Sequence, residues 1–342
     1  MEAGFVIETA VNAVVPILLL ILLGYFLRRI GFLSESFLSV GNKLVFKVCL
    51  PVMLFVNVYN TQDLSSIPWD VILYVTAIML VLFAVSFLTA IASTSIPERR
   101  GVVMQCFYRS NFAIIGLPLA SALGGSEAMS LAALLSAFTI PVFNVFAVIS
   151  LTVFLKKDDG SKISAKEIAL NIAKNPLIIG VLAGVVCLVI REIQVAAFGQ
   201  VAFSLKNDVA FVYKALDNIK AITSPFALIV LGGEFQFSAV SGMFKEIAVG
   251  TVCRLVITPL IGIVGAYLLS THTSILNCGA NEYPAMIALF GSPVAVSSAV
   301  MAGAMGNDKQ LATQLVVWTS IFSIFTIFLT VCIMMPAGLL SP

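Results

Sequence analysis

The 342-residue sequence is poor in charged residues and has a single histidine. Charged side chains make up 11% of the chain, against about 25% in a typical soluble domain, which is too few to cover a water-exposed surface. This composition argues against a soluble enzyme, a disordered chain and a nucleic-acid-binding protein. The net charge of +2 indicates no acidic partner, and His272 alone excludes a multi-histidine metal site.

Several motifs of catalysis and nucleotide binding are also missing. The chain has no Cys-x-x-Cys, no His-Glu-x-x-His, no Gly-x-Ser-x-Gly and no GxxxxGK[ST] loop, so we expect no enzyme activity, no cofactor and no ATP drive within this chain. Most of the six cysteines lie in apolar runs, which predicts packing residues rather than disulfides or a zinc site. The N-terminus lacks the basic start of a signal peptide, and its apolar run continues to Leu27, which is typical of a first membrane helix.

Long apolar runs dominate what is present. Sixty per cent of the residues are hydrophobic, and a membrane helix needs about 20 consecutive apolar residues. We predict an all-α membrane protein with ten spans, at residues 5–27, 37–58, 69–93, 101–124, 127–155, 175–195, 221–240, 245–270, 281–305 and 309–338. The mixed stretch 198–220 precedes the weakest span, and it is either an amphipathic surface segment or the first part of a long tilted helix.

The polar connector 156–174 divides five predicted spans from five. Its second half has helical spacing, which predicts a short interfacial helix, with a plain solvated linker as the alternative. In the ten-span arrangement, twelve lysines and arginines lie on the same side of the membrane as this connector, and four lie on the opposite side. The positive-inside rule then places the connector in the cytoplasm and both termini outside the plasma membrane.

The two halves share an ordered set of glycines and prolines. Pro16 and Gly24 match Pro176 and Gly184 with the same spacing, and both predicted spans four and nine carry a mid-span Gly-x-Pro. Because five spans is an odd number, the two repeats, 1–155 and 175–342, must have opposite orientations, as in many secondary transporters. Chance matching among apolar sequences is the alternative. Gly180 and Gly184 also form a Gly-x-x-x-Gly motif, which indicates close helix packing and allows oligomerisation.

Interrupted spans at matching places indicate a binding site. Proline removes a backbone hydrogen bond, and irregular backbone in a bilayer is tolerated only beside protein or a water-filled cavity. If the two breaks meet, half-helix N-termini favour an anion there; two ordinary proline kinks are the alternative. The candidate substrate-binding residues lie in or next to the breaks: Asn111, Gly116, Pro118, Ser292, Pro293 and Ser297.

Arg109 is a seventh candidate substrate-binding residue, since ionisable side chains inside membrane spans are functional candidates. Its guanidinium can hold a carboxylate with two hydrogen bonds, or it can extend to the membrane face as a snorkelling side chain. On a regular helix Arg109 and Asn111 diverge by about 200°. Both side chains therefore face one site only if the helix is irregular at this point.

Other ionisable residues within or next to the spans are candidates for ion coupling: Lys47, Glu234, Glu282 and Arg254. Each is equally consistent with a structural ion pair. A carboxylate of this set would carry a proton, whereas sodium would take oxygen ligands from carbonyls near Pro118 and Pro293.

The motifs resemble the auxin efflux carrier family of membrane transporters, which includes bacterial malate/malonate-type permeases and plant PIN-type carriers. The matching stretches are Tyr108-Arg109-Ser110-Asn111 with Gly116-Leu117-Pro118-Leu119, Leu50-Pro51-Val52-Met53-Leu54-Phe55, Asn175-Pro176-Leu177 and Gly291-Ser292-Pro293. The resemblance extends over essentially the whole chain.

That resemblance implies a fold like those of bile-acid symporters and sodium/proton antiporters. Predicted helices four and nine cross at their prolines, and a scaffold of spans one, two, six and seven supports a crossover transport domain of spans three to five and eight to ten. It implies alternating-access transport of a small organic anion, with Asn111, Pro118 and Pro293 at the substrate, and it makes a homodimer plausible. The short connector favours a small carboxylate over auxin. A ligand sensor without net transport and an intramembrane enzyme are the competing functions.

Overall fold

The computed structural model describes residues 3–60, 68–156, 163–279 and 282–340, and its regular elements in these ranges are helices. The elements are α1 (Ala3–Arg29), α2 (Glu35–Leu44), η1 (Val45–Cys49), α3 (Leu50–Tyr59), α4 (Trp69–Ser93), α5 (Pro97–Tyr108), η2 (Phe112–Gly116), α6 (Leu117–Val153), α7 (Ala165–Lys174), α8 (Pro176–Phe198), α9 (Ala210–Glu234), η3 (Phe237–Ala239), η4 (Ser241–Met243), α10 (Phe244–Val252), η5 (Cys253–Ile257), η6 (Leu260–Val264), α11 (Gly265–His272), α12 (Glu282–Gly291), α13 (Ser297–Ala304) and α14 (Lys309–Met334). The all-helical prediction is confirmed for this part of the chain.

Seven stretches of the described residues are long and apolar enough to cross a membrane, by length and composition alone. Three of the ten predicted spans, the first, fourth and ninth, have no stretch of their own among these seven, and for the fourth and ninth the reason is visible in the backbone. Predicted spans four and nine are each divided by a backbone break into short helices, α5 and η2 in one and α12 and α13 in the other. The end of predicted span four and the whole of span five fall within one continuous stretch, Phe112–Val153.

That stretch contains a turn at two glycines. Gly124 (φ −142°, ψ 16°) and Gly125 (φ 69°, ψ −157°) leave the helical conformation inside α6. The positive φ of Gly125 is a conformation that L-residues with a side chain rarely adopt. The predicted tight turn between residues 124 and 127 is therefore present, and it divides α6 into two helical arms.

The connector and the stretch before predicted span seven also take helical form. Helix α7 (Ala165–Lys174) carries a capping box in which Ser164 and Glu167 bond each other's backbone N–H, which fixes its first turn. Residues 157–162 of the connector lie outside the described ranges. Because α9 starts at Ala210 and is 25 residues long, residues 210–220 of this stretch are the beginning of a long helix.

Glycines set two close helix contacts at equivalent places. A Cβ at Gly24 of α1 would lie 2.0 Å from the Ile229 carbonyl oxygen of α9, and a Cβ at the matching Gly184 of α8 would lie 2.8 Å from the Val58 Cβ of α3. Both distances are shorter than real side chains allow, so the backbones approach only because these residues are glycines. The Gly-x-x-x-Gly motif of α8 thus makes the close helix packing that we expected, against α3 of the same chain.

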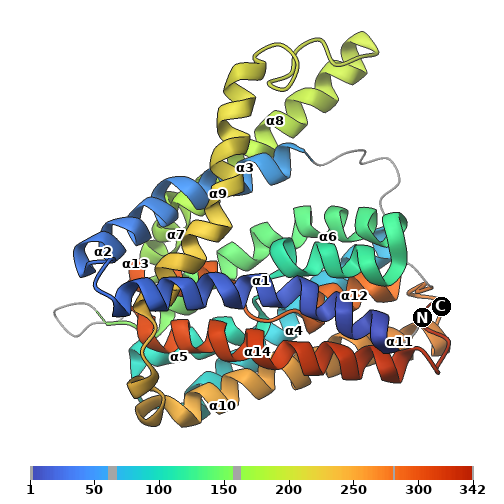
Figure 1. Ribbon diagram of the computed structural model, residues 1–342. Helices are drawn as coiled ribbons and strands as arrows, with labels where there is room; N and C mark the ends of the chain where they lie inside the picture. Colours follow the sequence, from blue (N-terminus) through green and yellow to red (C-terminus); the bar gives the residue numbers. More distant parts are fainter. Residues whose placement is uncertain (1–2, 61–67, 157–162, 280–281, 341–342) are drawn as a thin grey trace.

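Figure 1 shows how these contacts arrange the helices. Helices α1 and α14 lie side by side and run with α10 and α11, whereas α8 and the first part of α9 project away from this group. The chain begins and ends at the same end of the molecule, and the α1–α2 turn lies at the opposite end. The broken helices α5, α12 and α13 run within the larger group.

Candidate functional site

Two non-helical segments cross in the interior of the protein. Residues 109–111 separate α5 from η2, and residues 292–296 separate α12 from α13. The backbone N–H of Asn111 donates to the Pro293 carbonyl over 2.8 Å, and the N–H of Ala295 donates to the Arg109 carbonyl over 3.2 Å, forming an antiparallel bridge between Ser110 and Val294. The two breaks therefore satisfy part of each other's exposed backbone, as a segment at membrane depth requires.

The first break lies before the proline at which the sequence predicts it. Arg109 is extended (φ −84°, ψ 100°) and Asn111 has ψ 47°, whereas Pro118 lies in the first turn of α6. The π-helical turn η2 directly precedes this turn and widens the hydrogen-bond ladder, which accommodates the proline ring without a break. The irregular backbone instead brings Arg109 and Asn111 to one cavity.

This cavity, which we call the crossing cavity, has a volume of about 60 Å³. Its walls come from α3, the segments around both breaks, α6, α8 and α9, and they are mainly aliphatic and aromatic. The polar side chains that line it are Arg109, Ser110, Asn111, Asn144, Thr223, Ser224 and Ser297. An apolar cavity with few convergent polar groups is the usual form of a small-molecule site.

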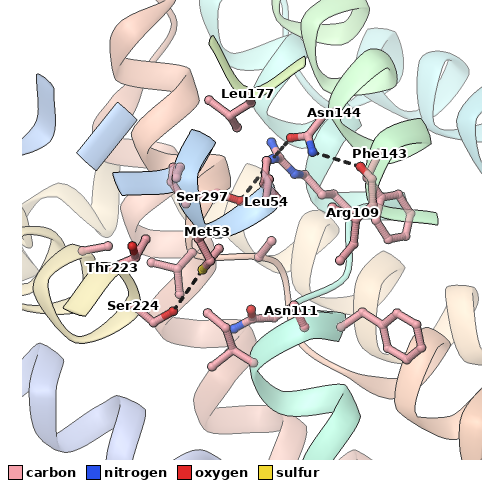
Figure 2. A pocket seen from close by; sticks show the side chains of 18 of the residues that line it. Met53, Leu54, Arg109, Asn111, Phe143, Asn144, Leu177, Thr223, Ser224 and Ser297 are labelled. Carbon is pink, nitrogen blue, oxygen red and sulfur yellow. Dashed lines mark hydrogen bonds between the residues drawn. The ribbon is translucent and has the colours of Figure 1, made fainter. Parts of the chain in front are cut away.

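Arg109 is buried, with 3% of its surface exposed, and its described partners are all uncharged. One guanidinium nitrogen donates to Asn144 Oδ1 (2.9 Å) and Ser297 Oγ (3.1 Å), and the other to Gln105 Oε1 (3.2 Å) and lies against the Met301 sulfur. Figure 2 shows the guanidinium beside Asn144 and Ser297. A buried charge without a counter-charge is costly, so a bound anion would stabilise this arrangement.

Two further polar groups at the crossing have no partner among the described residues. They are the side-chain nitrogen of Asn111 and the hydroxyl of Ser110, both fully buried atoms. Figure 2 shows Asn111 in a different part of the crossing cavity from Arg109. Buried donors are almost always bonded in native proteins, which makes these groups available to a ligand.

Two helix N-termini at the crossing cavity also favour a bound anion. Phe112, Ala113 and Ile114 in the first turn of η2, and Ser297 at the start of α13, line the crossing cavity. The first N–H groups of a helix have no partner within the helix, and together they carry partial positive charge. The ends of both broken helices therefore favour a negatively charged group in this cavity.

The other predicted substrate residues do not line the cavity. Pro118 is exposed, and Gly116 allows close packing, since a Cβ there would lie 2.9 Å from the Ala288 carbonyl oxygen. Ser292 is fully buried and its hydroxyl donates to Ala288 O over 2.6 Å. Pro293 contributes its carbonyl oxygen to the crossing itself, which leaves that oxygen engaged rather than free for a sodium ion.

Arg254, predicted as a coupling residue, lies on the other side of the crossing. It is fully buried, and its guanidinium donates to the carbonyls of Ser292 (2.9 Å), Phe290 (2.9 Å), Leu289 (3.1 Å) and Phe107 (3.3 Å). These carbonyls belong to the C-terminal ends of α5 and α12, which carry partial negative charge. Arg254 therefore joins the two broken helices.

The three remaining coupling candidates lie apart from the crossing cavity. Glu234 ends α9 and pairs with Lys309 of α14, with Asn42 3.5 Å away. Glu282 opens α12, where its carboxylate accepts the Gly279 N–H over 2.8 Å. Lys47 lies in the π-helical turn η1 and is exposed.

Sequence reasoning missed five polar residues of this site. Asn144 and Gln105 hold the Arg109 guanidinium, Ser110 lies in the first break, and Thr223 and Ser224 line the opposite wall. Asn144 had a signal, because an amide in the middle of an apolar span is unusual. No group of three or more His, Cys, Asp and Glu side chains is placed to hold a metal ion among the described residues.

Similarity to known proteins extends over nearly the whole chain. A family model described as membrane transport protein matches residues 9–331. The chain belongs to this family. It is the auxin efflux carrier family, so the resemblance seen in the sequence is confirmed. The chain is also 24% identical over 324 residues to an uncharacterized transporter of Methanocaldococcus jannaschii, a match that covers 93% of this chain and 96% of that protein.

Proposed function

We propose that this family member is a secondary-active transporter that moves a small carboxylate anion across the plasma membrane and binds it in the crossing cavity. Arg109 carries the proposal, because it is a buried cation on a cavity wall whose described partners are all uncharged. A carboxylate would accept from Arg109 and from the unpartnered Asn111 nitrogen. Malate, malonate and auxin-like acids are the first compounds to test.

The proposed architecture is two inverted repeats of five membrane helices. It is supported by the equivalent contacts of Gly24 and Gly184, which pack α1 on α9 and α8 on α3. These four helices would form the scaffold, and the crossing with its neighbours the transport domain. The lysine and arginine distribution supports termini outside and the 156–174 connector in the cytoplasm.

In the proposed cycle the anion binds between the scaffold and the crossing. The cavity wall combines Thr223 and Ser224 of α9 with Arg109 and Asn111 of the crossing, so movement of one part against the other would open it to either side. Coupling to protons through Glu234 or Glu282, or to sodium through backbone oxygens near the crossing, belongs to this proposal.

The test is ligand-dependent thermal stability of the full chain in detergent. Malate, malonate, succinate, lactate, pyruvate and indole-3-acetate are each added with and without sodium, at two pH values. A ligand that binds only the folded protein at a hundredfold excess over its Kd stabilises it by about 2.7 kcal/mol. We expect one carboxylate to raise the midpoint in the native chain and to have no effect on Asn111→Ala, while that variant stays folded.

Asn60→Ala is the matched control, since Asn60 accepts from Tyr213 away from the cavity. An equal ligand response in Asn111→Ala and the native chain would remove Asn111 from the site. Flux of the same carboxylate in proteoliposomes then separates a transporter from a sensor, because a sensor binds its ligand and moves nothing.

A further inference from the structure

A second, larger cavity opens at the end of the molecule where α1 meets α2. Its volume is about 670 Å³, and we call it the basic vestibule. Its walls come from α2, η1, the end of α9, α13 and the start of α14. The charged side chains that line it are Arg28, Lys43, Lys47, Lys309, Glu35 and Glu234.

Four cations and two carboxylates leave the basic vestibule with uncompensated positive charge. Arg28 pairs with Glu35 over 2.7 Å, and Lys309 pairs with Glu234. Lys43 and Lys47 have no acceptor within hydrogen-bonding distance among the described residues, and both are exposed. A cavity with low-dielectric walls focuses the field of such charges and raises the local concentration of anions.

Three helical stretches line both cavities: the continuous stretch formed by α2, η1 and α3, and helices α9 and α13. Along α2, η1 and α3, the vestibule residues Lys43 and Lys47 are followed one turn later by Leu50 and then Leu54 of the crossing cavity. The two cavities also divide α13 and α9 between them in the same way, Ser297 lining one and Gly303 the other. The two cavities are therefore lined by successive parts of the same helices.

We infer that the basic vestibule is a second anion site, at which Lys43 and Lys47 hold a carboxylate before it enters, or after it leaves, the crossing cavity. Lys47 is the inner member of the pair and lies within the π-helical turn η1, a feature that is frequent at functional sites. The moving solute is the carboxylate of the proposed function, on which this step rests. The positive charge of the vestibule itself does not rest on it.

Membrane topology alone explains lysines at the cytoplasmic face, but it does not require them to line a cavity. Lys166 and Lys174 of α7 are exposed, are predicted on the same side of the membrane, and are absent from the vestibule walls. They offer a matched control, since Lys166→Gln with Lys174→Gln removes the same charge as Lys43→Gln with Lys47→Gln.

The vestibule potential can be measured without knowing the substrate. A cysteine is introduced as Ser39→Cys in the vestibule wall, or as Ser36→Cys, which is exposed on α2 outside the wall. Each full-length variant reacts in detergent with the anionic sulfonatoethyl and the cationic trimethylammonioethyl methanethiosulfonate. The parent chain gives the background of the native cysteines.

We expect the anionic reagent to be favoured severalfold more at position 39 than at position 36. The preference should disappear in Lys43→Gln with Lys47→Gln and at high salt, because salt screens exposed charges, and it should persist in the α7 control. Equal reagent ratios at the two positions would overturn the inference, and so would a ratio that the lysine substitutions leave unchanged.

Two further arms identify the anion. In nanodiscs, a loss of preference at position 39 relative to position 36 when phosphatidylglycerol replaces phosphatidylcholine would assign the vestibule to lipid headgroups and overturn the proposed carboxylate. In proteoliposomes, the carboxylate found by thermal stability should move more slowly through Lys43→Gln with Lys47→Gln than through the α7 control; equal flux would overturn the staging role. If no carboxylate binds at all, the proposed function fails, while the reagent ratios still report on the vestibule.

Discussion

Two buried arginines lie at the crossing of the broken helices and have opposite surroundings. Arg254 donates to four backbone carbonyls at the C-terminal ends of α5 and α12. Arg109 donates to the side chains of Gln105, Asn144 and Ser297 and faces a cavity. One cation meets the negative ends of helices, and the other meets neutral groups.

These surroundings distinguish an arginine that stabilises the fold from an arginine that can bind a ligand. The carbonyls around Arg254 carry the partial negative charge of two helix ends, so this guanidinium is electrostatically satisfied within the protein. The neutral partners of Arg109 orient its guanidinium but do not balance its charge. A buried arginine in a membrane protein is thus a binding candidate only where the protein supplies no negative partner.

The largest expected effect on stability is at Arg254. Arg254→Met leaves the carbonyls of Leu289, Phe290 and Ser292 without this donor, while the Phe107 carbonyl keeps its bond from Thr258. Each buried acceptor that loses its donor costs about 1–3 kcal/mol. We expect a strongly lowered unfolding midpoint in detergent and a partial recovery in Arg254→Lys. A midpoint equal to that of the native chain would mean that the crossing does not depend on Arg254.

Arg109→Gln should have the opposite profile. The substitution removes a buried charge that has no counter-charge, so we expect the free energy of unfolding to change by less than about 1 kcal/mol. The stabilisation by carboxylate should be abolished. Arg29→Gln is the control, because Arg29 is exposed and bonds Tyr25 at the end of α1. A retained carboxylate response in Arg109→Gln contradicts the assigned site.

A designed counter-charge would make Arg109 resemble Arg254. Asn144→Asp keeps the shape of the side chain and places a carboxylate 2.9 Å from the Arg109 guanidinium, so the protein would carry its own anion. We expect a raised midpoint without ligand and no further shift with carboxylate. Asn144→Leu should lose the ligand response without the gain in midpoint, and identical behaviour of the two variants would contradict this reading.

The smallest effects should come from the hydroxyls beside each arginine. Thr258→Val removes the 2.8 Å bond from Thr258 to the Phe107 carbonyl, which we expect to lower stability by about 1 kcal/mol with ligand affinity unchanged. Ser297→Ala removes one acceptor of Arg109 and should weaken carboxylate affinity with little loss of stability. Titration of the thermal shift with ligand measures both stability and carboxylate affinity. Weakened affinity in Thr258→Val together with lost stability in Ser297→Ala would contradict the roles assigned to the two arginines.

Much of the fold is visible in the sequence because membrane helices are read from apolar length. The positions of most helices, the Gly124–Gly125 turn and the helix in the connector are present as predicted. The site of the first break is different. Proline chemistry points to Pro118, whereas the π-helical turn η2 accommodates the proline and the break forms at residues 109–111.

Of the candidate site, only residues at or next to the two breaks were predictable from the sequence. Arg109 and Asn111 stand out because polar residues are rare within apolar spans, and Ser297 follows the second break. Asn144, Thr223 and Ser224 lie on other helices, and their meeting at one cavity depends on tertiary packing. The division between Arg109 and Arg254 was equally hidden, since it depends on which groups surround each guanidinium.

The crossing itself is joined by main-chain hydrogen bonds, from Asn111 N–H to the Pro293 carbonyl and from Ala295 N–H to the Arg109 carbonyl. Such bonds are available whatever side chains the residues carry, provided that the donors are not proline. Substitutions on the cavity wall can therefore accumulate while the crossing stays intact. A lineage with this architecture can acquire a new solute by small steps, and directed evolution of the cavity wall can follow the same route.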